Sequence, residues 1–234
     1  MQIKFHGHAC IQITGQEHSV LVDPFLTGNP VAVESAETIK ADTILLTHGH
    51  DDHTGDAINI AKRNDATVIT IVELAAYLSL QGLESVVPMN IGGGASFPFG
   101  ELKWVPALHS SSAIVDGEII YLGNPAGFVL QMEGVTLYHA GDTALFSDMK
   151  LIGERYAPDI AFLPIGSHFT MDPTDALLAA QWLQAKVVVP IHYNTFSLIE
   201  QDGHDYAEKL KQYGIKGIVM EPGQVLDTST WQLV

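Results

Sequence analysis

The sequence predicts a single α/β domain over residues 1–234, in which one sheet packs on another and helices lie outside them. Short apolar runs separated by turn residues recur along the chain, and helical patterns alternate with them in the second half. No linker, low-complexity segment or repeat interrupts this pattern. With 234 residues, of which 47% are hydrophobic, the chain is long enough to bury one sizeable core.

The first hundred residues begin as a meander of strands and then alternate between strands and helices. We expect strands at Ile3–Phe5, Ile11–Thr14, Val20–Val22, Ile44–Thr47 and Thr67–Ile71, with helices at Asp56–Arg63 and Glu73–Gln81. The run MNIGGGASFPFG is turn chemistry, and we interpret it as a hairpin corner. A phosphate-binding loop would end in Gly-Lys-Ser/Thr, which is absent here.

The remainder returns to strands and then alternates. We expect strands at Leu102–Ala107, Glu118–Tyr121, Gly127–Met132, Val135–His139, Ile160–Leu163, Val187–Pro190 and Ile218–Met220. Helices are expected at Leu145–Tyr156, Pro173–Leu183 and His204–Tyr213, with Asp172 or Thr174 capping the second of them.

Composition excludes several classes of protein. Only 11 residues are Lys or Arg against 27 Asp or Glu, and without a basic run the chain lacks the features that bind nucleic acid. The single cysteine, Cys10, rules out an internal disulfide and a Cys-rich zinc finger, and its strand setting predicts a buried, inert thiol. No apolar run is long enough for a membrane span and no signal-peptide core is present, so we expect a cytoplasmic protein.

The segment THGHDDHTGD carries three histidines and an aspartate with the spacing of metal ligands. Side chains at i and i+2 of an extended segment share a face, so His48 and His50 can chelate one ion. Asp52 and His53 come where the chain turns into a helix and can serve a second ion. Four ligands this close reach one tetrahedral ion only with strain, so we expect two ions.

Further ligands are expected after other predicted strands, at His109, Asp142 and His192. Each follows an apolar β-type run, which is how an open site is assembled at one end of a sheet. Taken singly, a histidine after a strand is more often an ordinary polar residue, and Asp142 could cap a helix that begins near Thr143. The cluster at His48 to His53 favours the metal-binding interpretation.

These residues resemble the signature of the metallo-β-lactamase superfamily: His48-x-His50-x-Asp52-His53, followed in order by His109, Asp142 and His192. The stretches GHAC, LVDPFLTGNP, THGHDDHTGD, YHAGDT and PIHYNT are similar to its family of small, poorly characterised metal-dependent hydrolases. The resemblance implies a four-layer αββα sandwich with the metals at one edge. It assigns His48, His50 and His109 to one ion, Asp52, His53 and His192 to the other, and Asp142 to both.

Further residues of the site are indicated by the same resemblance and by the local sequence. Asp23, which is otherwise a turn former, would orient a metal-bound histidine, and His8 would lie near the site. We expect His168, Phe169, Tyr193 and Asn194 to line the substrate pocket, with Tyr193 or His168 donating to an oxyanion.

The predicted function is hydrolysis of a small ester-type substrate (phosphodiester, lactone or thioester) by a hydroxide that two divalent ions share. Asp52 and Asp142 would be the catalytic carboxylates. Zinc is the expected ion, with manganese, iron or nickel as alternatives. A non-catalytic protein that holds metal for binding or sensing is the competing interpretation. The resemblance also implies that redox iron chemistry is disfavoured, because the related flavodiiron reductases are expected to carry glutamate where this chain has His50. The sequence has no Gly-x-Ser-x-Gly motif, which disfavours a serine hydrolase.

Overall fold

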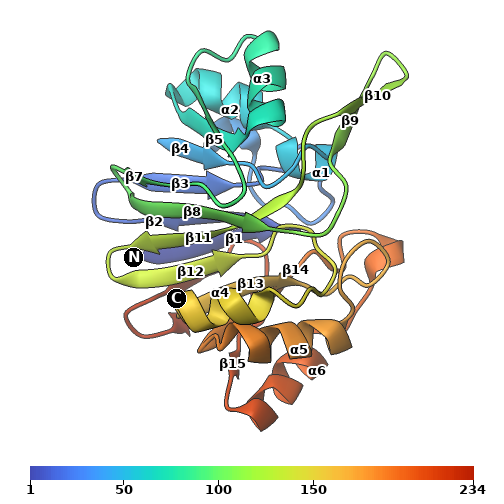
Figure 1. The fold of residues 1–234 in the computed structure, drawn as a ribbon. Coiled ribbons are helices and arrows are strands. Elements are labelled where there is room, and N and C mark those ends of the chain that lie inside the picture. The colour runs from blue at the N-terminus through green and yellow to red at the C-terminus, as the bar shows by residue number, and fades with distance from the viewer.

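Two mixed β-sheets face each other in the computed structural model, which describes residues 1–234 (Figure 1). The first sheet has the strand order β17-β16-β1-β2-β3-β4-β5-β6. Its strands are β1 (Gln2–Gly7), β2 (Cys10–Thr14), β3 (Ser19–Val22), β4 (Thr43–Leu45), β5 (Thr67–Ile71), β6 (Val86–Met89), β16 (Val225–Asp227) and β17 (Gln232–Leu233). Strands β3 to β6 run parallel, and the remaining pairs are antiparallel.

The second sheet has the order β15-β14-β13-β12-β11-β8-β7. Its strands are β7 (Gly94–Phe97), β8 (Gly100–Pro106), β11 (Ala126–Met132), β12 (Val135–His139), β13 (Ile160–Pro164), β14 (Val187–Ile191) and β15 (Lys216–Gly217). Strands β12 to β15 are parallel, and β7, β8, β11 and β12 are joined antiparallel. A separate hairpin of β9 (Ser112–Val115) and β10 (Glu118–Tyr121) projects from the body (Figure 1).

Helices lie on the outer side of each sheet (Figure 1). They are α1 (Asp51–Thr54), α2 (Ala57–Asn64), α3 (Val72–Leu80), α4 (Met149–Tyr156), α5 (Pro173–Leu183) and α6 (Gly203–Leu210), with short 3-10 turns at Ala36–Thr38, Ser197–Ile199 and Lys211–Tyr213. Helices α2 and α3 flank the first sheet, and α4, α5 and α6 flank the second. No helix is both long and apolar enough to cross a bilayer.

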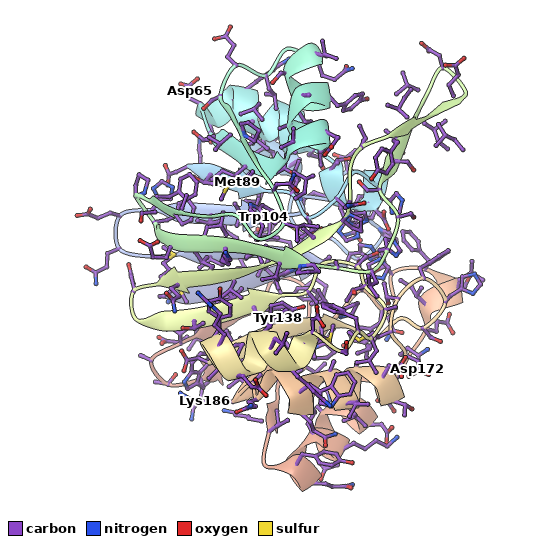
Figure 2. All side chains as sticks on the ribbon, viewed as in Figure 1. Asp65, Met89, Trp104, Tyr138, Asp172 and Lys186 are labelled. Carbon is purple, nitrogen blue, oxygen red and sulfur yellow. The ribbon has the colours of Figure 1, made fainter.

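Successive side chains of a strand point to opposite faces of the sheet, so they pack in different layers of the core. In β13, Phe162 packs between the sheets, while Ala161 and Leu163 pack under the helices of the second sheet. Trp104 is fully buried between the sheets and Tyr138 on the helix side (Figure 2). Each large buried apolar side chain contributes roughly 1.5–3 kcal/mol, so packing on both faces stabilises the strands whose ends carry the site.

The predicted layering is confirmed, and so are most of the predicted elements. The bounds of β5, β10, β12 and α5 agree with the prediction, and Asp172 is the N-cap of α5, accepting from the Asp175 amide. Strand β7 was not expected as such, but it forms a hairpin with β8 inside the predicted glycine-rich corner. Strands β6, β9, β16 and β17 were also missed.

Two expected elements were wrong in their bounds for identifiable reasons. No strand lies at the predicted Ile218–Met220; the strand lies just before it, at Lys216–Gly217. Beyond it only Ile218 continues the ladder, with a bond to the Val188 carbonyl, before the chain turns at Pro222. The helix predicted from Leu145 begins at Met149, since the preceding residues form the loop that carries Asp142.

Candidate metal centre

The predicted ligands lie on loops that follow strand ends at one edge of the two sheets. Strands β3 and β4 are parallel, and Asp23 and the loop with His48 follow them directly. Strands β12, β13 and β14 are also parallel, and the loops after them carry Asp142, His168 and His192. Ligand sites of α/β sheets form where the carboxyl ends of parallel strands meet, and both sheets contribute to this one.

The central cluster begins in an irregular turn and ends in a single turn of helix. His50 is the N-cap of α1, so the chain enters the helix at Asp51, next to Asp52 and His53. Before it, His48 and His50 face each other, with Nε2 of His48 2.9 Å from Nδ1 of His50. The change from extended chain to helix therefore directs the two pairs of ligands to different places.

The ligand atoms form three overlapping groups, in each of which all ligand atoms lie within 4.8 Å of one another. The groups are His48, His50 and His109; His8, Asp52, His53 and His192; and His48, His53 and Asp142. The first two contain the sets that the resemblance implied for two ions, with His8 added to the second. The assignment of particular residues to particular ions stays a prediction.

Asp142 lies between the groups and contacts members of both. Its Oδ1 is 3.3 Å from Nε2 of His53, and its Oδ2 is 3.0 Å from Nε2 of His192 and 3.6 Å from Nε2 of His109. The alternative role, as a helix cap, is wrong, because the next helix begins only at Met149.

Several buried polar atoms of this cluster have no hydrogen-bond partner in the right orientation, although most of them lie close to opposite charges. They are His53 Nε2, Asp142 Oδ1 and both ring nitrogens of His192. Buried polar groups are normally paired, so atoms left unpaired at one point need a binding partner of another kind. Imidazole nitrogen and carboxylate oxygen are ligands that zinc, manganese, iron and nickel accept. The residues present therefore fit divalent metal ions.

Asp23 is fully buried behind the cluster and holds His53 in place. Its Oδ2 accepts hydrogen bonds from Nδ1 of His53 at 2.8 Å and from the Thr47 hydroxyl at 2.7 Å, and its Oδ1 accepts from the Thr47 amide at 2.9 Å. His53 directs its other nitrogen, Nε2, toward Asp142. Burial opposes a charge on His53, but the Asp142 and Asp23 carboxylates outweigh it and raise the pKa of His53 well above its ordinary value, so Nε2 must release a proton before it can ligate an ion. A carboxylate in this position orients a ligating histidine.

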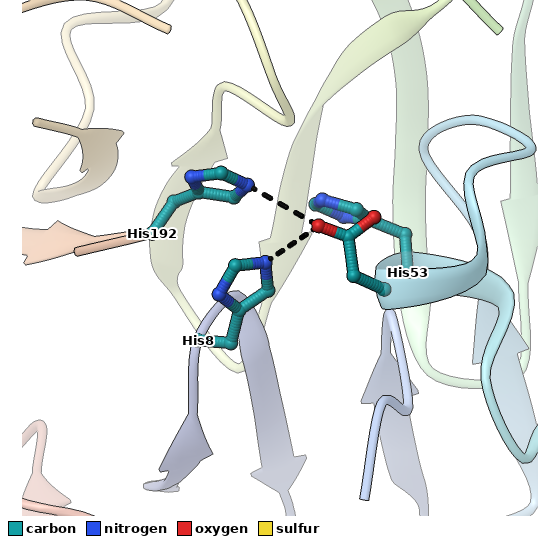
Figure 3. Close-up of side chains that lie close together, drawn as sticks. His8, His53 and His192 are labelled. Carbon is teal, nitrogen blue, oxygen red and sulfur yellow. Dashed lines mark hydrogen bonds and ion pairs between the residues drawn. The ribbon is translucent and has the colours of Figure 1, made fainter. Parts of the chain in front are cut away.

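His8 joins the N-terminal part of the site to the C-terminal part (Figure 3). Its Nε2 is 3.1 Å from Oδ2 of Asp52, and its Nδ1 is 2.9 Å from the Thr195 hydroxyl. Its backbone carbonyl accepts from the amide of His192 at 2.8 Å. His8 was expected near the site, and the structure places its ring nitrogen among the ligand atoms themselves.

Burial and neighbouring charges set the protonation states of the cluster. Burial lowers the pKa of His8 to about 4, and the adjacent His192 adds to the shift. Burial also opposes a charge on His192, but the Asp142 carboxylate outweighs it and raises the pKa of His192 to about 9. Burial acts against the ionised form of Asp142, yet His192 and His53 hold its pKa well below the usual value. Asp142 is thus ionised at neutral pH, and His192 must release a proton before it can ligate an ion.

The predicted pocket residues lie on the loops around the cluster. His168 and Phe169 are exposed after β13, with their rings in edge contact at 4.6 Å between centroids. Tyr193 and Asn194 help to line a cavity of about 100 Å³ that His8 also lines. Burial, followed by the nearby Glu221 and Asp202, raises the pKa of Tyr193 to about 12, so its hydroxyl keeps its proton. Their contact with substrate stays a prediction.

Sequence reasoning missed the hydroxyl residues that hold the loops. Thr47 binds Asp23, Thr195 binds His8, and the Thr143 hydroxyl accepts from the Leu108 amide. The Ser111 hydroxyl accepts from the amide of Gly49, between two predicted ligands. Each of the four lies within three positions of a predicted ligand, a local signal that could have identified them.

Comparison with known proteins agrees with this fold. Residues 2–192 match the Beta-lactamase superfamily domain. A metallo-β-lactamase fold protein of Bacillus subtilis superposes with a TM-score of 0.71 at 12% identity, covering 96% of this chain and 98% of that one. Fold and sequence together define a metal-dependent hydrolase of the metallo-β-lactamase type.

The chain belongs to the UPF0173 metal-dependent hydrolase family. Its relative from Geobacillus thermodenitrificans is 53% identical over 228 residues, which cover 97% of this chain and all of the relative. The structure of Igni18, a metallo hydrolase from the archaeon Ignicoccus hospitalis, superposes with a TM-score of 0.87 at 38% identity, covering 96% of this chain and 97% of that one. The predicted family and the predicted class of enzyme are confirmed, against the alternative of a non-catalytic metal-holding protein.

Proposed function

We propose that this enzyme hydrolyses a small ester-type substrate (phosphodiester, lactone or thioester) with two divalent ions held in the cluster. The supporting observation is the position of Asp142, whose carboxylate contacts imidazoles of both ligand groups. The proposed ligands are His48, His50 and His109 for one ion, Asp52, His53 and His192 for the other, and Asp142 for both. Zinc suits this nitrogen and oxygen set, as do manganese, iron and nickel.

When bound, such a pair of ions supplies a hydroxide nucleophile near neutral pH and polarises the reacting oxygen of the substrate. The residues of the chain supply the rest. Asp142 is ionised and nearly inaccessible, so it keeps a fixed carboxylate between the two groups. Asp52 is the more open of the two, with 31% of its side chain exposed. Its carboxylate can accept a hydrogen bond from the attacking water and orient it.

Hydrogen-bond donors on the loops around the cluster would stabilise the oxyanion that forms when the carbonyl or phosphoryl group is attacked. Tyr193 keeps its hydroxyl proton at neutral pH because its pKa is raised to about 12. His168 lies exposed on the loop after β13, next to Phe169. We propose one of these two side chains as the donor, since preorganised hydrogen bonds to an oxyanion strongly accelerate acyl transfer.

The proposal is tested with a substrate panel and the substitution Asp142→Ala. The metal-loaded enzyme is assayed on a cyclic phosphodiester, an aryl phosphodiester, a lactone, a thioester and a lactam, with metal content measured in parallel. Losing the shared carboxylate should lower kcat/KM by about 100-fold or more and reduce the bound metal, because metal-ion catalysis contributes several kcal/mol.

Asp148→Ala is the matched control, because Asp148 is an exposed aspartate of the same loop whose side chain accepts a hydrogen bond from the Ser147 hydroxyl and from no candidate ligand. It should retain both metal and turnover. Full metal-dependent activity in Asp142→Ala would disprove the proposal. Silence of the wild type on every substrate, with two ions verified, would remove the ester-type assignment.

A further inference from the structure

We propose that this site selects uncharged carbonyl esters, meaning lactones, thioesters or acyl esters, that carry an apolar group, and discriminates against anionic phosphodiesters. The inference rests on the proposed function and narrows its substrate class. It follows from the side chains that surround the cluster rather than from the ligands.

Two aromatic side chains form an apolar wall beside His8. The ring centroids of Phe25 and Phe196 are each 5.6 Å from that of His8 and 6.3 Å from each other. Phe25 follows β3 and Phe196 follows β14, so the wall is built from both halves of the chain. Phe196 remains 39% exposed, which leaves an apolar surface open next to the residue that contacts Asp52.

A second apolar edge adjoins Asp142. Leu108 immediately precedes the predicted ligand His109, and its amide donates to the Thr143 hydroxyl at 3.0 Å. The loop with Phe169 is attached to the same residue, because the Met171 amide donates to the Thr143 carbonyl at 3.0 Å. Leu108 is 55% exposed and Phe169 51% exposed. Large apolar side chains left open beside buried polar ligands are typical of a site that binds apolar groups.

The loops that build the site contain no lysine or arginine. They span residues 8–9, 23–35, 46–56, 107–111, 140–148, 165–172 and 192–202. The cation that touches one of them is Lys4, which is paired with Glu34. Other cations have partners away from these loops. Arg63 donates to the Ala36 carbonyl, the Lys150 ammonium lies over the Trp182 ring, and Lys209 pairs with Asp205 on α6.

This charge distribution disfavours an anionic substrate. The chain carries a net charge of −16, and two divalent ions would leave most of it in place. Phosphate groups are usually bound by arginine forks or lysine, and a field of like charge lowers both the encounter rate and the affinity for an anion. An uncharged ester avoids this cost and gains from the apolar walls.

The test uses p-nitrophenyl esters of acetate, butyrate, hexanoate and octanoate with the metal-loaded enzyme, and bis(p-nitrophenyl) phosphate as the anionic substrate. We expect kcat/KM to rise about twofold to fourfold for each added methylene until the wall is covered, since each buried methylene contributes about 0.8 kcal/mol. Phe196→Ala and Phe169→Ala should flatten this rise. Leu80→Ala is the control, because Leu80 is 85% exposed at the end of α3 and should leave the rise unchanged.

A variant that adds a positive charge tests the electrostatic part of the proposed discrimination against phosphodiesters. Leu198 is 60% exposed on the loop after β14, and Leu198→Lys should raise the ratio of kcat/KM for the phosphodiester to kcat/KM for the acetate ester several-fold. Binding of octanamide, an uncharged compound that the enzyme would not turn over quickly, gives a readout independent of activity. Calorimetry should show about tenfold weaker octanamide binding to Phe196→Ala than to the wild type.

The outcomes separate this inference from the proposed function. A flat chain-length series, octanamide binding that Phe196→Ala does not weaken, or hydrolysis of the phosphodiester alone would overturn the inference and leave a metallohydrolase. Absence of turnover on all substrates with two ions present would overturn the proposed function, and octanamide binding would then still decide for or against the apolar walls.

Discussion

Asp23 accepts a hydrogen bond of 2.8 Å from Nδ1 of His53, across thirty positions of sequence and with both side chains fully buried. The same carboxylate accepts two hydrogen bonds from Thr47, so all three bonds hold the segment that leads into the ligand cluster. The orientation of His53 is therefore set by a residue from a neighbouring strand end rather than by its own short helix.

Asp23→Asn should weaken metal binding by about 10- to 100-fold, because the amide cannot accept from both His53 and Thr47 as the carboxylate does. Competition with a chromophoric chelator measures the affinity. Asp65→Asn is the matched control, since both aspartates have positive φ, at 44° for Asp23 and 53° for Asp65, but Asp65 is exposed at the end of α2. Equal affinity of Asp23→Asn and wild type would show that this hydrogen bond does not orient a ligand.

Removal of the metal should destabilise the fold. The cluster buries imidazole nitrogens and a carboxylate oxygen without hydrogen-bond partners. A bound ion stabilises the native state by an amount that grows with the logarithm of the free metal concentration relative to Kd. At free metal about 100-fold above Kd the gain is about 2.7 kcal/mol, or a Tm increase of about 5–10 °C for a chain of this size. Scanning calorimetry with and without a chelator measures it. An unchanged Tm, with removal of the ions verified, would contradict the prediction.

The metal-free enzyme should lose stability as the pH rises. The pKa of His192 is raised to about 9 in the folded chain from an ordinary value near 6.5, in spite of burial and because of Asp142. A raised pKa means that the stabilisation is complete below pH 6.5 and disappears as the pH passes through about 9. The Tm of the metal-free enzyme should therefore fall between pH 6.5 and 9.5.

His192→Gln provides the comparison for this pH dependence, because glutamine does not titrate. Its Tm should change less over the same interval. A metal-free wild type with a constant Tm from pH 6.5 to 9.5 would show that the pairing of His192 with Asp142 does not stabilise the fold.

The sequence could indicate that the candidate ligands lie together because they follow strands that the local pattern already indicates. His48, His109, Asp142 and His192 all stand within a few residues of an apolar β-type run. The order of the motifs then identified the superfamily and its layered sandwich.

What the sequence could not indicate depends on contacts between distant segments. The position of His8 requires the β1–β2 turn to meet both α1, which carries Asp52, and the loop after β14, which carries Thr195. The wall of Phe25 and Phe196 has the same origin. Short edge strands such as β15 and β17 were missed or displaced because two residues carry no usable periodicity.

Cys10 should be unreactive in the native enzyme. Its side chain is fully buried, and burial, together with the carboxylates of Asp23 and Asp56, raises the pKa of the thiol well above its ordinary value. The thiolate is the reactive form, so a disulfide reagent at pH 8 should label the folded chain at a negligible rate and release one equivalent in guanidinium. Labelling of the native enzyme at the rate of a free thiol would contradict the buried position.

Gly141→Ala should destabilise the loop that carries Asp142 by more than the cost of the left-handed backbone alone. Gly141 has φ +60°, and a Cβ there would lie 2.8 Å from the Ala126 carbonyl oxygen and 3.0 Å from Cβ of Thr47. Gly134→Ala is the matched control, because Gly134 has φ +80° in the β11–β12 turn and a Cβ there would meet nothing within 4 Å.

Both substitutions should cost about 1–2 kcal/mol for the left-handed backbone. Gly141→Ala should cost about 1–3 kcal/mol more because of the overpacked contacts, and it should also weaken metal binding, since the loop must shift away from Thr47. Urea unfolding of the metal-free variants gives the first difference, and chelator competition gives the second. Because the two glycines share their backbone conformation, equal losses of stability and equal metal affinity would mean that close packing against β11 and Thr47 does not position Asp142.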